Sequence, residues 1–171
     1  MTEDSTACDE AHGNRAAERD TRNLVAVFAS PMARYLLAYG RDAGYRVTLV
    51  EPELDRAAEV SGDGVAVSAT ATGLDGDTDV VVTDHHRGEL GPVLRDVLAQ
   101  PVRWVGVMGN PHREGPHVVA LRGLGVPDDE IARVHRPIGL NIGSRTPPEI
   151  AIATLAGLLA DRNGKPGGFV F

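Results

Sequence analysis

The residues whose types and spacing best suit chemistry lie in one glycine-containing loop and the helix start that follows it. Gly139 and Gly143 stand four residues apart, and the run Thr-Pro-Pro-Glu at 146–149 is typical of a helix start. Glycine has no Cβ atom, so backbone N–H groups beside it can approach a ligand closely. The first turn of a helix adds unbonded N–H groups and the positive end of the helix dipole. The segment therefore predicts a site for a phosphate group or a phosphorylated cofactor, the alternative being an ordinary tight turn before a helix.

Polar side chains in the same segment complete this candidate site. Arg145 is the strongest single candidate for a phosphate contact, because a planar guanidinium can bind two oxygens. Asn141, Ser144 and Thr146 are the other polar candidates. Glu149 follows Thr146 by three residues, which matches a capping box and indicates a structural role for this carboxylate.

A second set of candidates follows the predicted strands, because ligands bind beyond the carboxyl ends of the strands in a doubly wound sheet. Glu51 predicts either a contact to a ribose diol or a solvated surface acid. Asp84 and His85 predict ligand contact or acid–base chemistry, or else a hydrogen-bonded turn. Gly109 would allow close approach and Asn110 would contact phosphate, unless the two form an ordinary turn.

The turn after the first predicted strand argues against the usual mode of NAD binding. A dinucleotide-binding turn has the pattern G-x-G-x-x-G, but residues 28–33 contain no glycine. Pro31 also lacks an N–H donor, and Ala29 carries a Cβ atom where a pyrophosphate must approach. Ser30 can still donate a hydroxyl hydrogen bond to a ligand.

The spacing of apolar residues predicts the elements that position these candidates. Short apolar runs predict strands at 24–28, 45–50, 65–67, 79–83 and 103–108. Helices are predicted at 31–43, 53–60, 90–99, 118–124, 128–134 and 147–161, the first with Ser30 as its N-cap. Strands that alternate with helices in this way predict the α/β class, with a doubly wound, mostly parallel, Rossmann-like sheet and helices on both faces.

The composition narrows the class of protein and its partners. The 171 residues are enough for one domain, predicted at 23–163 between a flexible acidic tail at 1–22 and a loose end at 164–171. A net charge of −7 argues against nucleic acid or an anionic membrane as a partner. No apolar run is long enough for a transmembrane helix, and no signal peptide is expected. The single cysteine, Cys8, excludes an internal disulfide and fits a cytoplasmic location.

Residues 135–151 read H-R-P-I-G-L-N-I-G-S-R-T-P-P-E-I-A, and supporting segments lie at 30–34, 44–47, 82–85 and 104–110. These segments resemble the C-terminal Rossmann-like domain of the XdhC/CoxI family, over a stretch from about Leu24 to Asp161. The family pattern is a histidine, then P-I-G-L-D-I-G, then T-P-x-E-I-A. This chain departs from the family where Asn141 replaces an aspartate, where Asp84-His85 reverses a His-Asp order, and where 110–112 replaces a more basic stretch.

The resemblance implies a role in the maturation of enzymes of the xanthine dehydrogenase or carbon monoxide dehydrogenase type. Proteins of this family are described as binding the molybdenum cofactor and delivering it, after sulfuration, to the apoenzyme. The implied ligand is a pterin phosphate with molybdenum, or its dinucleotide form. The implied partners are a molybdenum hydroxylase apoenzyme and, beside it, a separate XdhC N-terminal-type domain or a cysteine desulfurase, with a homodimer left open.

Two other classes of function compete with a non-catalytic cofactor carrier. One is an NAD(P)-dependent oxidoreductase, which the missing glycines disfavour. The other is a small-molecule sensor or a scaffold that keeps the fold without the site. The histidines show no metal-ligand spacing such as H-E-x-x-H, so no metal site is predicted. The favoured hypothesis is a non-catalytic carrier, so no catalytic residue is predicted either.

Overall fold

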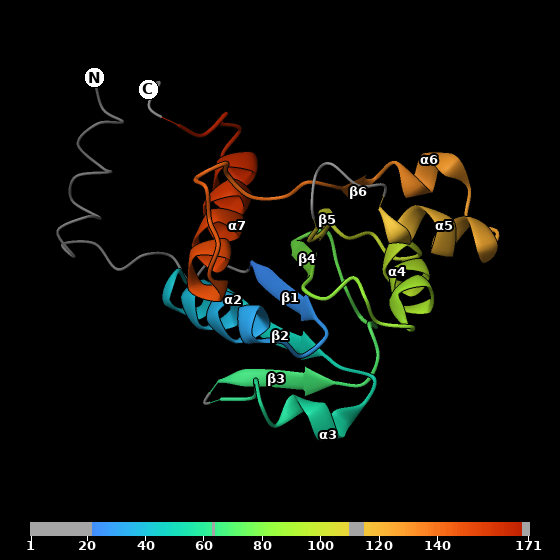
Figure 1. The fold of residues 1–171 in the computed structure, drawn as a ribbon, viewed down its shortest axis with the longest axis horizontal. Helices are drawn as coiled ribbons and strands as arrows, with labels where there is room; N and C mark the ends of the chain where they lie inside the picture. Colours follow the sequence, from blue (N-terminus) through green and yellow to red (C-terminus); the bar gives the residue numbers. More distant parts are fainter. Residues whose placement is uncertain (1–21, 63, 110–114, 169–171) are drawn as a thin grey trace, which may run out of the picture.

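The computed structural model describes residues 22–62, 64–109 and 115–168. Asn110 and the predicted tail with Cys8 therefore lie outside the described residues. Six strands form one sheet (Figure 1). They are β1 Asn23–Val27, β2 Arg46–Val50, β3 Val65–Ser68, β4 Thr78–Val82, β5 Trp104–Val107 and β6 Val134–His135. The helices are α2 Pro31–Asp42, α3 Leu54–Ala57, α4 Leu90–Leu98, α5 Pro116–Gly123, α6 Asp128–Ile131 and α7 Pro147–Arg162.

The strand order is β3-β2-β1-β4-β5-β6, and every pair of neighbouring strands is parallel. The order reverses between β1 and β4, which is the topological switch point of a doubly wound sheet. The predicted Rossmann-like α/β fold is confirmed. All the carboxyl ends of the strands consequently meet at one edge of the sheet, which we call the carboxyl edge.

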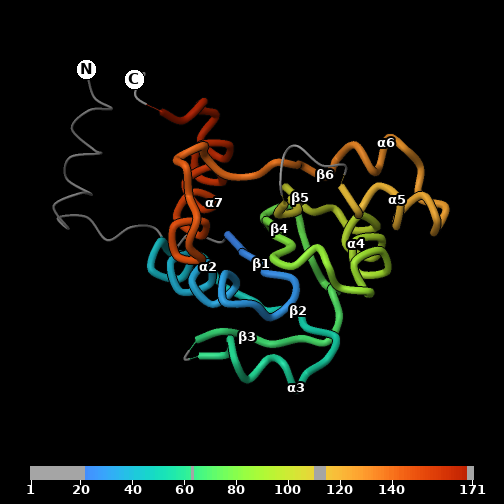
Figure 2. Tube along the Cα trace, in the orientation of Figure 1, coloured from blue at the N-terminus to red at the C-terminus, as the bar shows by residue number. Residues whose placement is uncertain are grey.

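Two apolar cores lie on opposite faces of this sheet. Successive residues of β1 alternate between them, since Val25 and Val27 pack with α4 and α5, whereas Leu24 and Ala26 pack with α2 and α7. Helices α2 and α7 lie side by side, and α4 and α5 lie together apart from them (Figures 1 and 2). Helices thus cover both faces, as the sequence predicts.

The end of α7 is tied to the sheet by charged groups at the edge opposite the carboxyl edge. Asp79 at the start of β4 is fully buried and accepts hydrogen bonds from Arg103 and, at 3.0 Å, from Arg162. Arg103 also pairs with Asp161. Helix α7 therefore runs antiparallel to the strands, and its first residues lie toward the carboxyl edge.

One element differs from the prediction. The sequence predicts a helix over 128–134, but α6 ends at Ile131, and Val134 starts the two-residue strand β6 beside β5. Such a short strand has no periodic pattern of its own, and pairing with β5 decides its conformation. Among the described residues, no helix has the length and apolar character that crossing a bilayer requires.

Candidate functional site

The turn after β1 keeps a strained backbone although it lacks glycine. Among the described residues, Phe28 is the only non-glycine residue with a positive φ, at 73°. Its N–H donates to Val50 at 2.8 Å, and its carbonyl accepts from the Thr83 hydroxyl at 2.8 Å. A left-handed conformation costs a non-glycine residue about 1–3 kcal/mol, and persists where the surroundings hold it in place. Phe28 thus stands where a dinucleotide-binding turn has its first glycine.

Ser30 serves the start of α2 rather than a ligand. Its Oγ accepts from the N–H of Ala33 at 3.0 Å, which confirms the predicted N-cap. Its hydroxyl donates to the Thr83 hydroxyl at 2.9 Å. The Ser30 hydroxyl, which the sequence predicts as a donor to a ligand, therefore already donates within the turn.

Glu51 is neither a surface acid nor a free ribose ligand, and both sequence interpretations of it are wrong. The side chain is fully buried, and Arg87 donates two hydrogen bonds to its carboxylate, at 3.0 and 2.9 Å. The N–H groups of Ala29 and Glu53 donate two more, at 2.7 and 3.0 Å. The carboxylate accepts two hydrogen bonds at each oxygen, so no lone pair is left for a sugar hydroxyl.

The electrostatics of this pair keep it fully ionised. Burial opposes the charge on Glu51, but the hydrogen bonds from Arg87, Ala29 and Glu53 outweigh burial and lower its pKa. The hydrogen bond to Glu51 in turn raises the pKa of Arg87. The Arg87 guanidinium also lies 4.7 Å from the centre of the Phe28 ring. The Ala29 N–H therefore already donates to the Glu51 carboxylate, although a bound dinucleotide would need this N–H group.

Polar groups also gather where β4 and β5 end. Asp84 accepts from the N–H of His86 at 2.9 Å, so it shapes the turn after β4, as one of the two sequence interpretations proposes. His85 is half-buried and bonds to the backbone of Met108, after β5. Burial lowers the pKa of His85, and the nearby His86 and Arg136 lower it further.

Arg136 extends this cluster from the end of β6. A Cβ atom at residue 109 would lie 2.4 Å from Nη2 of Arg136, and one at residue 115 would lie 2.9 Å from its Nη1. The sequence predicts that Gly109 allows a ligand to approach closely, but the guanidinium of Arg136 lies in that space instead. His117, in the first turn of α5, is buried beside Arg136, and burial followed by the Arg136 charge lowers its pKa. We call His85, His117 and Arg136 the edge cluster.

The sequence interpretation did not select Arg136 or His117 for this site. His117 entered it only as one of several histidines, and Arg136 only as part of the resemblance. The signal that identifies them is the pair of glycines at 109 and 115, which flank the loop between β5 and α5 and leave room for both side chains.

The glycine loop that the sequence favours packs against α7 instead of surrounding a ligand. A Cβ atom at residue 139 would lie 3.0 Å from the backbone of Ala153 and Thr154, and one at residue 157 would lie 3.0 Å from Cα of Gly139. The N–H of Leu140 donates to the carbonyl of Ala153 at 3.0 Å. Gly139 is therefore required by loop–helix packing. Gly143 faces open space with φ at 68°.

The start of α7 lacks the free amides that the sequence predicts there. The N–H groups of Arg145 and Thr146 both donate to the carboxylate of Glu149, at 2.8 and 3.1 Å, and the second of these bonds belongs to the predicted capping box. The next two positions are prolines and have no N–H. The expected anion contact of these amides is therefore wrong. The side chains of Asn141, Arg145 and Thr146 are exposed and Ser144 is half-buried, and their contact with a ligand stays a prediction.

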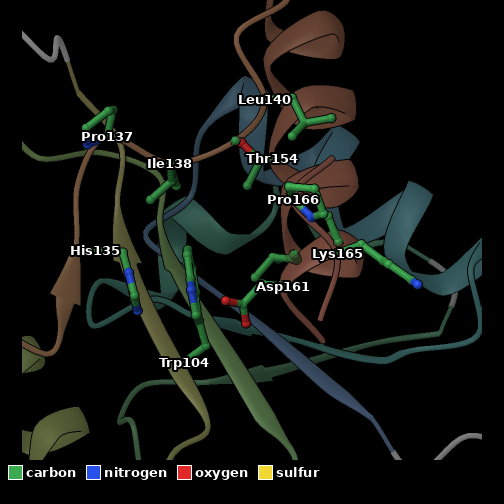
Figure 3. A pocket seen from close by; sticks show the side chains of 13 residues that line it. Trp104, His135, Pro137, Ile138, Leu140, Thr154, Asp161, Lys165 and Pro166 are labelled. Atoms are coloured by element: carbon green, nitrogen blue, oxygen red, sulfur yellow. The ribbon is translucent and has the colours of Figure 1, made fainter. Parts of the chain in front are cut away.

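A pocket of about 280 Å³ lies on the α7 side of the sheet, and Figure 3 shows it from close by. The rings of Trp104 and His135 stack with their centres 5.0 Å apart and form one wall. The carboxylate of Asp161 points toward these rings, whereas Lys165 points away (Figure 3). Asp161 is bound to Arg103 at the start of β5, so this end of the pocket lies away from the carboxyl edge, whereas Pro137 and Ile138, which follow β6, line its other end.

Comparison with known proteins identifies the domain. The model of the XdhC Rossmann domain matches residues 24–158. The chain belongs to the XdhC family. This XdhC domain is 40% identical over 77 residues to the uncharacterized protein YqeB of Escherichia coli K12, a match that covers 45% of the chain and 14% of YqeB. A crystal structure described as a xanthine dehydrogenase from Bacillus halodurans matches with a TM-score of 0.67 at 20% identity, covering 84% of the chain and 45% of that protein.

The identity to the Bacillus structure supports the fold alone, and the chain spans less than half the length of either protein. Within this XdhC domain, residues 135–151 form strand β6, the loop that packs on α7, and the capping box of α7. The most specific part of the family resemblance is thus largely structural, apart from Arg136. The side chains of the edge cluster converge at the carboxyl edge from three separate segments.

Proposed function

We propose that this XdhC domain is an accessory protein that binds the molybdenum cofactor, as the pterin phosphate or its dinucleotide form, and delivers it to a molybdenum hydroxylase apoenzyme. The observation that carries the proposal is the family match over residues 24–158. The proposed recipient is an enzyme of the xanthine dehydrogenase or carbon monoxide dehydrogenase type.

The carboxyl edge offers a suitable seat for the anionic part of such a ligand. Ligands of doubly wound sheets bind at this edge. The edge cluster contributes the positive charge of Arg136 together with two imidazoles, which fits a phosphate better than a cation. In the described ranges, no three His, Cys, Asp or Glu side chains gather around one metal position. We therefore propose that the domain holds the cofactor through its phosphate and pterin, with no protein ligand to molybdenum from these ranges.

The same geometry disfavours the competing oxidoreductase. NAD(P) in its usual pose needs the amides of the turn after β1 and an acidic residue at the end of β2. In this chain Glu51 binds the Ala29 amide and Arg87, so a dinucleotide would have to displace a buried ion pair. A scaffold that has lost its ligand site is the remaining alternative.

Ligand-dependent melting separates these three functions. A ligand that binds only the folded protein raises stability by about 2.7 kcal/mol at a hundredfold excess over its Kd. For a protein of this length, that corresponds to a rise in Tm of roughly 5–10 °C. The proposal expects this rise with the molybdenum cofactor or its cytosine or guanine dinucleotide form. A rise with NAD(P) alone would favour the oxidoreductase, and no rise with any of them would favour the scaffold.

Delivery is tested by transfer to an apoenzyme. We expect the loaded domain to activate a purified molybdenum hydroxylase apoenzyme faster than free cofactor at equal concentration. We propose that a separate XdhC N-terminal-type domain or a cysteine desulfurase assists the transfer, as the family resemblance implies. Adding either protein should then increase the rate of activation. Equal rates with free and loaded cofactor would contradict a delivery role.

A further inference from the structure

His117 is a buried side chain that the fold leaves with an unused polar atom. It is 5% exposed, and its Nδ1 has no hydrogen-bond partner among the residues that the structure describes. Leaving a buried polar atom unpaired is costly, so most such atoms in folded proteins find a partner in protein, water or ligand. The N-cap of α5, Gly115, makes no side-chain hydrogen bond.

The unpaired nitrogen and the Arg136 guanidinium approach the same place. A Cβ atom at residue 115 would lie 2.4 Å from Nδ1 of His117 and 2.9 Å from Nη1 of Arg136. Glycine at this position therefore allows a hydrogen-bonding nitrogen of each side chain to lie at the start of α5. This helix has eight residues, and the positive end of its dipole lies there as well.

We propose that His117 and Arg136 form an oxyanion-binding seat at the start of α5, which takes a terminal phosphate or pyrophosphate group. The proposed function supplies the identity of the natural ligand, the phosphate of the pterin cofactor. The seat lies at the carboxyl edge, at the end of β6, and not in the glycine loop that carries Arg145.

The charges around the seat decide between an anion and a metal ion. Arg136 repels a cation, and it lowers the pKa of both His85 and His117. The other ionisable groups of the β4 turn are Asp84, whose carboxylate is engaged by the His86 amide, and His86. The negative charge of a bound oxyanion favours a proton on Nδ1 of His117, which then donates to the ligand.

The test compares pyrophosphate binding by the parent and three variants, measured by calorimetry at pH 7. His117→Leu removes the nitrogen and keeps an apolar side chain of similar size, so the free protein should still fold. His135→Leu is the matched control. His135 lies in β6, and its ring stacks on Trp104 on the α7 side of the sheet, whereas His117 lies in α5 on the opposite side. Arg145→Ala tests the competing seat. We expect His117→Leu to weaken pyrophosphate binding at least tenfold, and the two other variants to match the parent.

Parent-like binding by His117→Leu would overturn the seat. If the variant does not fold, the imidazole ¹⁵N resonances of His117 in the parent decide the question, and they should shift on addition of pyrophosphate. An unchanged resonance while pyrophosphate binds would overturn the seat too, as would a parent that does not bind pyrophosphate.

The same variants, titrated with the molybdenum cofactor, separate this inference from the proposed function. Cofactor binding that survives His117→Leu unchanged rejects the seat and leaves the function standing. If the protein binds pyrophosphate through His117 but does not bind the molybdenum cofactor, the result supports the seat and rejects the proposed function.

Discussion

The carboxylate of Glu51 shares two hydrogen bonds with Arg87 and two with backbone amides, all within a buried turn. Replacing Glu51 by Gln removes the buried counter-ion of Arg87 and leaves only the more exposed carboxylates of Glu89, at 2.9 Å, and Glu53. Breaking a buried ion pair on one side typically costs about 3–5 kcal/mol. We expect Glu51→Gln to lower the free energy of unfolding by roughly 3 kcal/mol in denaturant titrations. Glu53→Gln is the control; its carboxylate is 3.6 Å from Arg87 and 53% exposed, so its loss should cost less than about 1 kcal/mol.

The same pair predicts a dependence of stability on pH. The pKa of Glu51 is lowered in the folded protein from its ordinary value of 4.5. A carboxyl of this kind stabilises the fold at pH above 4.5, and the stabilisation is lost as the pH falls through the lowered pKa. The difference in unfolding free energy between parent and Glu51→Gln should therefore shrink below pH 4.5. A difference that stays constant down to acid unfolding would contradict an ionised Glu51.

His117 predicts a dependence on pH of the same sign as that of Glu51, but in a higher pH range. Its pKa is lowered in the folded protein from 6.5, mainly by burial, so the unfolded chain binds a proton more readily. Stability contributed by the neutral side chain is complete above pH 6.5 and decreases as the pH falls below that value. We expect His117→Leu to be at least as stable as the parent at pH 7.5, and to gain on it as the pH falls to 5. His85 titrates in both proteins, so the difference isolates His117.

At the scale of elements, two glycines decide how the loop after β6 meets α7. Alanine normally favours a helix over glycine by about 1 kcal/mol. Alanine at position 157 should be less favourable than glycine, because the added Cβ atom would lie 3.0 Å from Cα of Gly139. We expect Gly157→Ala to destabilise the protein by about 1–3 kcal/mol, the usual cost of overpacking. Gly123→Ala in α5 meets nothing within 4 Å and should be neutral or stabilising. Equal effects of the two substitutions in thermal melts would remove the packing argument.

At the scale of the whole molecule, the two cores share one sheet and should unfold together. Neighbouring residues of β1 belong to opposite cores, so a displacement of β1 disrupts the packing of both cores at once. The single tryptophan, Trp104, lies in β5 and reports on the α7 side. We expect its fluorescence and the far-ultraviolet circular dichroism to give the same midpoint in urea. Two separate midpoints would indicate that one face opens independently.

Sequence patterns predicted most of the fold because the signals that define its elements are local. Ser30 before Pro31 and Thr146 before two prolines mark helix starts, and both lie at the N-caps of their helices. Strand β6 was not predicted from the sequence, because pairing with β5 holds its two residues in place. Glu51 was misread for a related reason, since its partner Arg87 lies 36 residues away in the chain.

By itself, the sequence determined the class of fold and the family, because apolar periodicity, helix caps and motif letters depend on neighbouring residues. Only the tertiary structure decided which polar groups remain for a ligand at the carboxyl edge. It engages Glu51 and the amides of Arg145 and Thr146 within the protein, and it brings His85, His117 and Arg136 together from three separate segments. The physical reason is that a hydrogen-bonding group is available or consumed according to its partners in space, and those partners lie far apart along the chain.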